Sequence, residues 1–238
     1  MEIPTEKTKK ASGLGDQVIT IYGTPKIGKS TLASQFPNAL FAATEPGLNF
    51  LEVYQVPIGD WTDFTNLCAI VASSPLQVET LVIDTVDILY LHCRDHVCNK
   101  AGIMHPSDAS YGKGFAMVNG EFRRVLAKLG TLRTREGGKM GLVLVSHAKE
   151  IEHDTRVGKQ LRWTPSLPGS ARQIVEGMSD LLLFADVDSS DERVLRTKPS
   201  NRWVAGDRTG NLPETLPLSY EALSSAMNGG QQKETSDE

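Results

Sequence analysis

The chain has 238 residues, of which 39% are hydrophobic and 23% are charged. These fractions are ordinary for a globular protein and exclude collagen-like, fibrous and wholly disordered chains. The formal net charge is -4 and there are only three cysteines, so the sequence is neither a polycation nor a disulfide framework. We find no apolar run of about 18 residues and no apolar stretch behind the first lysines, so we expect no membrane contact and a cytoplasmic location.

Short apolar runs alternate with amphipathic segments along the chain. In chain order we expect a strand at 17–22, a helix at 30–36, a strand at 39–43, a helix at 60–71, a strand at 80–83, helices at 86–100 and 117–132, a strand at 141–145, a helix at 170–178, and strands at 180–185 and 193–197, the last two forming a hairpin. Strands that are apolar throughout and alternate with helices predict an α/β fold of three layers with a mostly parallel sheet. We expect a flexible arm at 1–15, one core at 16–227 and a disordered tail at 228–238.

The segment between the first strand and the first helix has the pattern G-x-x-x-x-G-K-[ST], which is typical of a phosphate-binding P-loop in this context. Gly23 and Gly28 let the backbone curl so that its N–H groups face phosphate oxygens. Lys29 would neutralise the β and γ phosphates, and the Ser30 hydroxyl would ligate Mg²⁺. The sequence therefore predicts ATP and Mg²⁺ as cofactors, bound by Gly23, Thr24, Pro25, Lys26, Ile27, Gly28, Lys29, Ser30 and Thr31.

Other polar residues follow the predicted strands, whose carboxyl ends share one edge of a parallel sheet. Asp84 ends an apolar strand, as a Walker B acid does, and would hold Mg²⁺ together with Ser30. Thr85 occupies the next position, where many ATPases have a catalytic Glu, so we expect Glu45 to orient the attacking water. His147 follows the fourth strand and is expected to contact the γ-phosphate, which completes the predicted catalytic set of Lys29, Glu45 and His147.

This order of elements resembles the RecA-like recombinase core. More narrowly, the chain looks like AAA-family phage nucleotide-binding proteins, the phage-encoded P-loop ATPases that act as RecA-like single-strand annealing proteins. The motifs that carry this resemblance are Tyr22 to Ser30, Ile83 to Asp87, Tyr111 to Gly114, Ser146 to Glu150 and Asp207 to Gly210. The resemblance implies an ATPase of a bacterial host's cytoplasm that binds single-stranded DNA, assembles as a homo-oligomer and meets a single-strand-binding protein.

The resemblance also implies roles for two loops and a basic stretch. The loops at 101–114 and 149–169 would face single-stranded DNA, through Lys113, Arg156, Lys159, Arg162 and Trp163. Arg196 and Lys198 match the place where RecA-like assemblies reach a neighbour's ATP with cationic fingers. The alternative for these residues is a solvated loop, with Trp163 packed on the core, and a charged hairpin face.

We expect annealing or ATP-dependent binding of single strands rather than strand invasion, because only 22 residues precede Gly23. Three other functions use the same core: a helicase or packaging motor, a small-molecule kinase, and a nucleotide-dependent switch without DNA. The sequence offers no compact arginine-rich lid, which argues against the kinase.

Overall fold

The computed structural model describes residues 13–73, 78–134, 137–155 and 158–234. Its strands are β1 (Val18–Gly23), β2 (Ala39–Ala43), β3 (Tyr54–Pro57), β4 (Thr80–Asp84), β5 (Gly141–Thr155), β6 (Gly158–Pro165), β7 (Leu181–Val187), β8 (Arg193–Arg196), β9 (Gly206–Asp207) and β10 (Thr215–Pro217). Its α-helices are α1 (Lys29–Ala33), α2 (Trp61–Ser73), α3 (Val86–Ala101), α4 (Lys113–Leu129), α5 (Gly169–Met178) and α6 (Tyr220–Glu234), and its 3-10 turns are η1 (Leu14–Asp16), η2 (Pro106–Asp108) and η3 (Ser110–Gly112).

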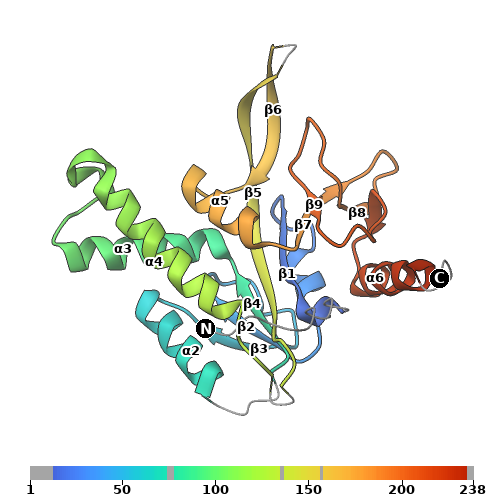
Figure 1. The fold of residues 1–238 in the computed structure, drawn as a ribbon, viewed down its shortest axis with the longest axis horizontal. Helices are drawn as coiled ribbons and strands as arrows, with labels where there is room; N and C mark the ends of the chain where they lie inside the picture. Colours follow the sequence, from blue (N-terminus) through green and yellow to red (C-terminus); the bar gives the residue numbers. More distant parts are fainter. Residues whose placement is uncertain (1–12, 74–77, 135–136, 156–157, 235–238) are drawn as a thin grey trace, which may run out of the picture.

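The strands form one sheet in the order β10-β8-β7-β1-β5-β4-β2-β3, with β6 paired to β5 and β9 paired to β7. The strands from β7 to β3 along this order run parallel, and β8, β9, β10 and β6 are antiparallel additions. Helices lie on both sides of the sheet (Figure 1). The predicted α/β class, with three layers around a mostly parallel sheet, is confirmed.

Apolar residues on alternating sides of each strand build two cores, because successive side chains of a strand point to opposite faces. One core joins α2, α3, α4 and α5 to side chains such as Leu81 and Leu144. The other core joins α1 and α6 to side chains such as Val82 and Val145. Since both faces are covered, the central strands read as continuous apolar runs.

The segment predicted as a DNA-facing loop at 149–169 is instead mostly a two-stranded ribbon. Strand β5 continues past the predicted end at 145 to Thr155 and pairs with β6, from Ala148↔Pro165 to Thr155↔Gly158. This β5–β6 ribbon extends away from the body of the molecule (Figure 1). Alternation of polar and apolar residues in the ribbon is weak, which is why the pattern favoured a loop.

The structure corrects both ends of the predicted core. Helix α6 continues to Glu234, so the first part of the predicted tail is helical. Leu14 is buried in the α1/α6 core, so the last part of the predicted arm belongs to the fold, whereas residues 1–12 and 235–238 lie outside the described residues. Strand β3 was not predicted, because its side chains are mostly exposed and carry no apolar run. Helix α4 begins at Lys113 and ends at Leu129, four and three residues before the predicted bounds of 117 and 132.

Candidate functional site

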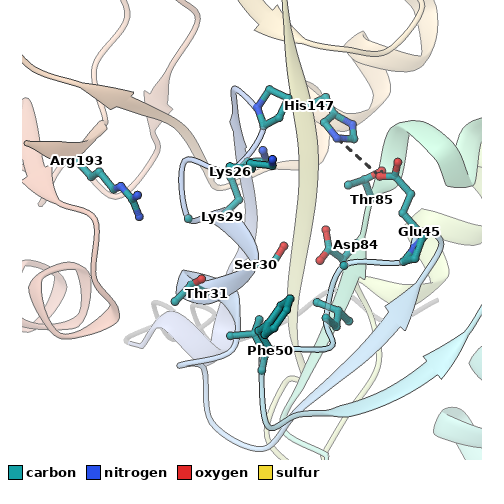
Figure 2. A pocket seen from close by; sticks show the side chains of 16 residues that line it. Lys26, Lys29, Ser30, Thr31, Glu45, Phe50, Asp84, Thr85, His147 and Arg193 are labelled. Carbon is teal, nitrogen blue, oxygen red and sulfur yellow. Dashed lines mark hydrogen bonds and ion pairs between the residues drawn. The ribbon is translucent and has the colours of Figure 1, made fainter. Parts of the chain in front are cut away.

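The carboxyl ends of five strands meet at one edge of the sheet. In the strand registers Ala43 pairs with Asp84, Asp84 with Val145, and Gly23 with both His147 and Ala185. A pocket of about 370 Å³ opens at this edge. It is lined mainly by residues that follow β1, β2, β4 and β5 (Figure 2), including Lys26, Gly28, Lys29, Ser30, Thr31, Glu45, Phe50, Asp84, Thr85, His147 and Arg193.

The P-loop between β1 and α1 has the backbone that its glycines allow. A Cβ at Gly23 would lie 2.6 Å from the carbonyl oxygen of Ala185 on the neighbouring strand, so no larger residue fits. Gly28 has a φ of +112°, a conformation that L side chains rarely adopt. Ile27 is buried in the core beneath the loop, while Thr24, Pro25 and Lys26 are exposed above it. The buried Ile27 side chain therefore holds the loop on the core, and the exposed side of the loop is accessible to a ligand.

Lys29 is buried against this loop and faces the acidic side of the pocket. Its Nζ donates to the carbonyl oxygens of Gly23 at 3.0 Å and of Thr24 at 2.9 Å. Burial lowers the pKa of Lys29, and the charges of Asp84, Asp87 and Glu45 oppose that effect. A phosphate bound at the loop would add further negative charge beside this ammonium group and so favour its charged form.

Ser30 and Asp84 face one another from α1 and β4 (Figure 2). Burial raises the pKa of Asp84, while a hydrogen bond with the Ser30 side chain and the charge of Lys29 lower it. A buried carboxylate beside a hydroxyl is a donor set of hard oxygen ligands, which suits Mg²⁺. Both groups thus fit the predicted metal role.

Glu45 lies in the same pocket as Lys29, at the start of the segment after β2. Its Oε2 accepts a hydrogen bond from Thr85 Oγ1 at 2.9 Å, and His147 Nε2 lies 3.7 Å from the same oxygen. The second His147 nitrogen, Nδ1, lies 2.7 Å from Asp87 Oδ2. The hydrogen bond to Asp87 raises the pKa of His147, against the effect of burial. One chain of polar contacts therefore joins α3, β5 and the carboxylate predicted to act on water.

The residues predicted as trans fingers make contacts within the chain. Arg196 pairs with Asp186 at 3.2 Å and lies 5.2 Å from the ring centre of Trp203. Lys198 pairs with Asp207 at 3.2 Å. Their role toward a neighbouring subunit stays a prediction.

The residues predicted to contact DNA are spread over two regions. Trp163 packs beside Phe184 at 6.2 Å between ring centres, which agrees with the alternative of a tryptophan packed on the core, and its role toward DNA stays a prediction. Lys159 pairs with Glu152 on the ribbon at 3.0 Å, and Arg162 donates to the carbonyl oxygen of Trp203. Lys113 is exposed at the start of α4, outside the ribbon, and Arg156 lies outside the described residues.

Phe50 and Arg193 line the pocket, and Thr44 directly precedes Glu45, but none of these residues was predicted to act there. Thr44 exchanges hydrogen bonds with Thr85, donating to its carbonyl oxygen and accepting from its N–H, and so fixes the turn after β4. Phe50 lines the pocket with a 99% exposed side chain. Arg193 reaches the pocket from β8. Arg193 comes near the P-loop through the pairing of β8 with β7, and no local motif in the sequence indicates this position.

An anion-binding loop, a buried lysine, an acid–hydroxyl pair and a second carboxylate at one edge of a parallel sheet define a P-loop ATPase. The chain belongs to the AAA domain family, whose model matches residues 16–209. No helix within the described residues is long and apolar enough to cross a membrane.

The chain is also similar to a curated protein and to a solved structure. The chain is 29% identical over 109 residues to the SPbeta prophage-derived uncharacterized protein YorG of Bacillus subtilis (strain 168). That match spans 44% of this chain and 34% of the relative, so it covers about a third of the relative's length. Among solved structures, the flagellar accessory protein FlaH from Methanocaldococcus jannaschii is 11% identical, with a TM-score of 0.43 over 84% of each chain.

Proposed function

We propose that this chain binds ATP together with Mg²⁺, hydrolyses it, and uses the nucleotide to control binding of single-stranded DNA. The proposal that the chain hydrolyses ATP rests on one observation: Glu45 lines the same pocket as Lys29, Ser30 and Asp84. Lys29 and the P-loop amides bind the phosphates, and Ser30 with Asp84 holds the metal. The metal ion supplies positive charge that offsets the charge on the transferred phosphoryl group.

The contacts of Glu45 explain how its carboxylate would be oriented. Thr85 and His147 both approach Oε2, and no described residue makes a hydrogen bond to Oε1. Oε1 is therefore the oxygen that can accept a proton from water, while Oε2 fixes the plane of the group. Asp87 orients the His147 ring through Nδ1, so that Nε2 faces the carboxylate.

The first experiment separates binding from hydrolysis. Glu45→Gln keeps the shape of the side chain but removes the base, so we expect steady-state ATP hydrolysis to fall by about 10²–10⁴-fold while ATP binding persists. Lys29→Ala is expected to weaken ATP binding itself. Glu52→Gln, an exposed residue outside the pocket, is the matched control. Unchanged hydrolysis by Glu45→Gln would contradict the assignment.

Strand β5 supports a link between the nucleotide and DNA. It passes from the sheet through Ser146 and His147 and continues without interruption into the β5–β6 ribbon. Because His147 and the ribbon belong to the same strand, a shift of His147 toward or away from the γ-phosphate would change the position of the ribbon. The ribbon carries Lys159 at 70% side-chain exposure, which a phosphate backbone could reach. Annealing is inferred from the resemblance to RecA-like annealing proteins, and the match to a prophage-derived protein agrees with a phage origin.

The second experiment tests this link with a fluorescently labelled single strand. We expect its anisotropy to rise on addition of protein with ATP, and the ATPase rate to increase, both falling steeply with salt. Lys159→Ala should weaken binding, whereas Lys128→Ala, at another exposed lysine on α4, should not. If the strand changes neither quantity at low salt, the chain is a nucleotide-dependent switch without DNA.

A further inference from the structure

A cavity of about 120 Å³ lies between helices α2 and α4 (Figure 1). Helix α2 contributes Thr65, Cys68, Ala69 and Ala72 to it, at the spacing of three and four residues that marks one helix face. Helix α4 and the turn after it form the other wall. This α2–α4 groove lies on the sheet face opposite the P-loop helix, and it shares no lining residue with the nucleotide pocket.

A change from large to small side chains along α2 opens the groove. At the start of α2, Trp61 is buried with its ring centre 6.3 Å from that of Phe122 on α4. The same side chain donates from Nε1 to Glu121 Oε1 at 3.2 Å, so the two helices are joined there. Farther along α2, Ala69 and Ala72 are too short to fill the same space, which leaves it accessible.

The floor of the α2–α4 groove is apolar. Val125 and Leu129 are buried, and the half-buried Cys68 and Leu132 pack against the same core. Burial raises the pKa of the Cys68 thiol to about 12, against the effect of the Lys128 charge, so the thiol stays neutral near pH 7. An apolar cavity of about 150 Å³ can hold one benzene ring. The groove therefore has room for a single large apolar side chain.

The charged residues that line the groove are both cations. Arg124 and Lys128 lie four residues apart on α4, and both are exposed. Glu121 accepts hydrogen bonds from Arg124 Nε at 2.9 Å and NH2 at 2.8 Å, which holds the guanidinium group in place. Within the described part of the chain, Arg124 NH1 and the ammonium group of Lys128 have no hydrogen bond or ion pair. Both can therefore bind a carboxylate.

We propose that the α2–α4 groove binds an acidic peptide segment of a partner protein, which inserts one large apolar side chain and places carboxylates beside Arg124 and Lys128. Charge complementarity selects this occupant, because the two cations attract carboxylates and repel a basic segment. Exposed ion pairs alone contribute little, so the apolar side chain on the floor supplies most of the affinity. The proposal does not depend on the proposed ATP site.

The test uses the full chain and three short synthetic peptides with a fluorescent label. The first consists of several aspartates followed by one phenylalanine, the second has alanine in place of the phenylalanine, and the third has lysines in place of the aspartates. We expect the first peptide to bind, with an affinity that falls as salt is added, and each of the others to bind at least about tenfold more weakly. No binding of the first peptide, or equal binding of all three, would overturn the proposal.

Substitutions at exposed positions locate the binding surface. Lys128→Glu should weaken binding of the acidic peptide by at least about tenfold, whereas Lys100→Glu, exposed on α3 outside the groove, should not. Ala72→Phe fills the groove from its exposed rim and should cause a similar loss, whereas Ala116→Phe, exposed on α4 outside the groove, should cause none. Unchanged affinity in both Lys128→Glu and Ala72→Phe would place the peptide elsewhere and refute the assignment.

Two other occupants give distinct results with the same variants. If Lys128→Glu abolishes binding of a labelled oligothymidine, the groove belongs to nucleic acid. If it lowers the mass of the chain in sedimentation equilibrium, the groove is an interface between copies of this chain. Either result would overturn the assignment to an acidic peptide.

Discussion

At the scale of single residues, the polar side chains of the site orient one another through hydrogen bonds and ion pairs. Glu45 lies on the irregular segment after β2, where Thr85 and His147 contact one oxygen of its carboxylate. His147 in turn is fixed at both its backbone N–H and its ring Nδ1 by the two carboxylate oxygens of Asp87. A change at Asp87 therefore reaches the carboxylate of Glu45 through His147.

This arrangement predicts a pH-dependent contribution to stability. The hydrogen bond to Asp87 raises the pKa of His147 above its usual value of 6.5. The folded state therefore binds the proton more tightly than the unfolded state, and the stabilisation is complete below pH 6.5 and is lost as the pH rises through the raised pKa. Asp87→Asn removes the partner that raises the pKa of His147. We therefore expect the free energy of unfolding of this variant to fall less as the pH rises above 6.5.

The measurement is urea unfolding of the two proteins over a pH range that brackets 6.5 and extends above it. Asp95→Asn is the control, since Asp95 is exposed on α3 and pairs with Arg94 instead of a histidine. Identical pH profiles for Asp87→Asn and the unaltered chain would show that the His147 pair does not contribute.

At the scale of elements, the C-terminal helix α6 closes the sheet face that carries the P-loop helix. Leu223 and Met227, one turn apart, are buried in the same core as Leu32 of α1. Tyr220 adds an edge-to-face ring contact with Phe36 at 4.9 Å, and its N–H donates to Gln35. Through these contacts α6 packs against helix α1, which carries Ser30 and Thr31 of the pocket.

Leu223→Ala should therefore lower the free energy of unfolding by about 2–5 kcal/mol, because it leaves a cavity at a fully buried position. Glu221→Ala, exposed two residues earlier on the same helix, should change it by less than about 0.5 kcal/mol. Chemical denaturation measures both. Equal, small effects would mean that α6 does not pack on the body of the protein.

The buried helices and strands could be predicted from the sequence, whereas the exposed strands could not. The central strands and most helices were predicted, because buried strands are continuous apolar runs and the helices carry apolar stripes. The exposed edge strand β3 and the ribbon part of β5 and β6 were not, because their pairing is set by partners far along the chain and leaves little apolar pattern. Trp163 belongs to this group: its ribbon register places it beside Phe184 and Trp203.

At the scale of the whole molecule, strand order decides which residues meet. Strand β5 lies between β1 and β4, so His147 stands between the P-loop and Asp84. Strand β8 pairs with β7 in a register that sets Arg193 opposite Val187, beyond the level of Gly23, whereas Arg196 lies farther back beside Phe184. One arginine of this strand therefore lines the pocket at the P-loop, and the other is held in an internal ion pair.

The sequence by itself determined the P-loop, the acid after the third predicted strand and the α/β class, because each follows from local backbone geometry or from apolar periodicity. It also indicated Glu45 and His147, since parallel strands bring their carboxyl ends to one edge. Only the tertiary structure decided that Thr85 and Asp87 orient those two groups, that Trp163 is packed, and that Arg193 lines the pocket at the P-loop. Those facts depend on registers between segments distant in the chain, and no local pattern of residues encodes them.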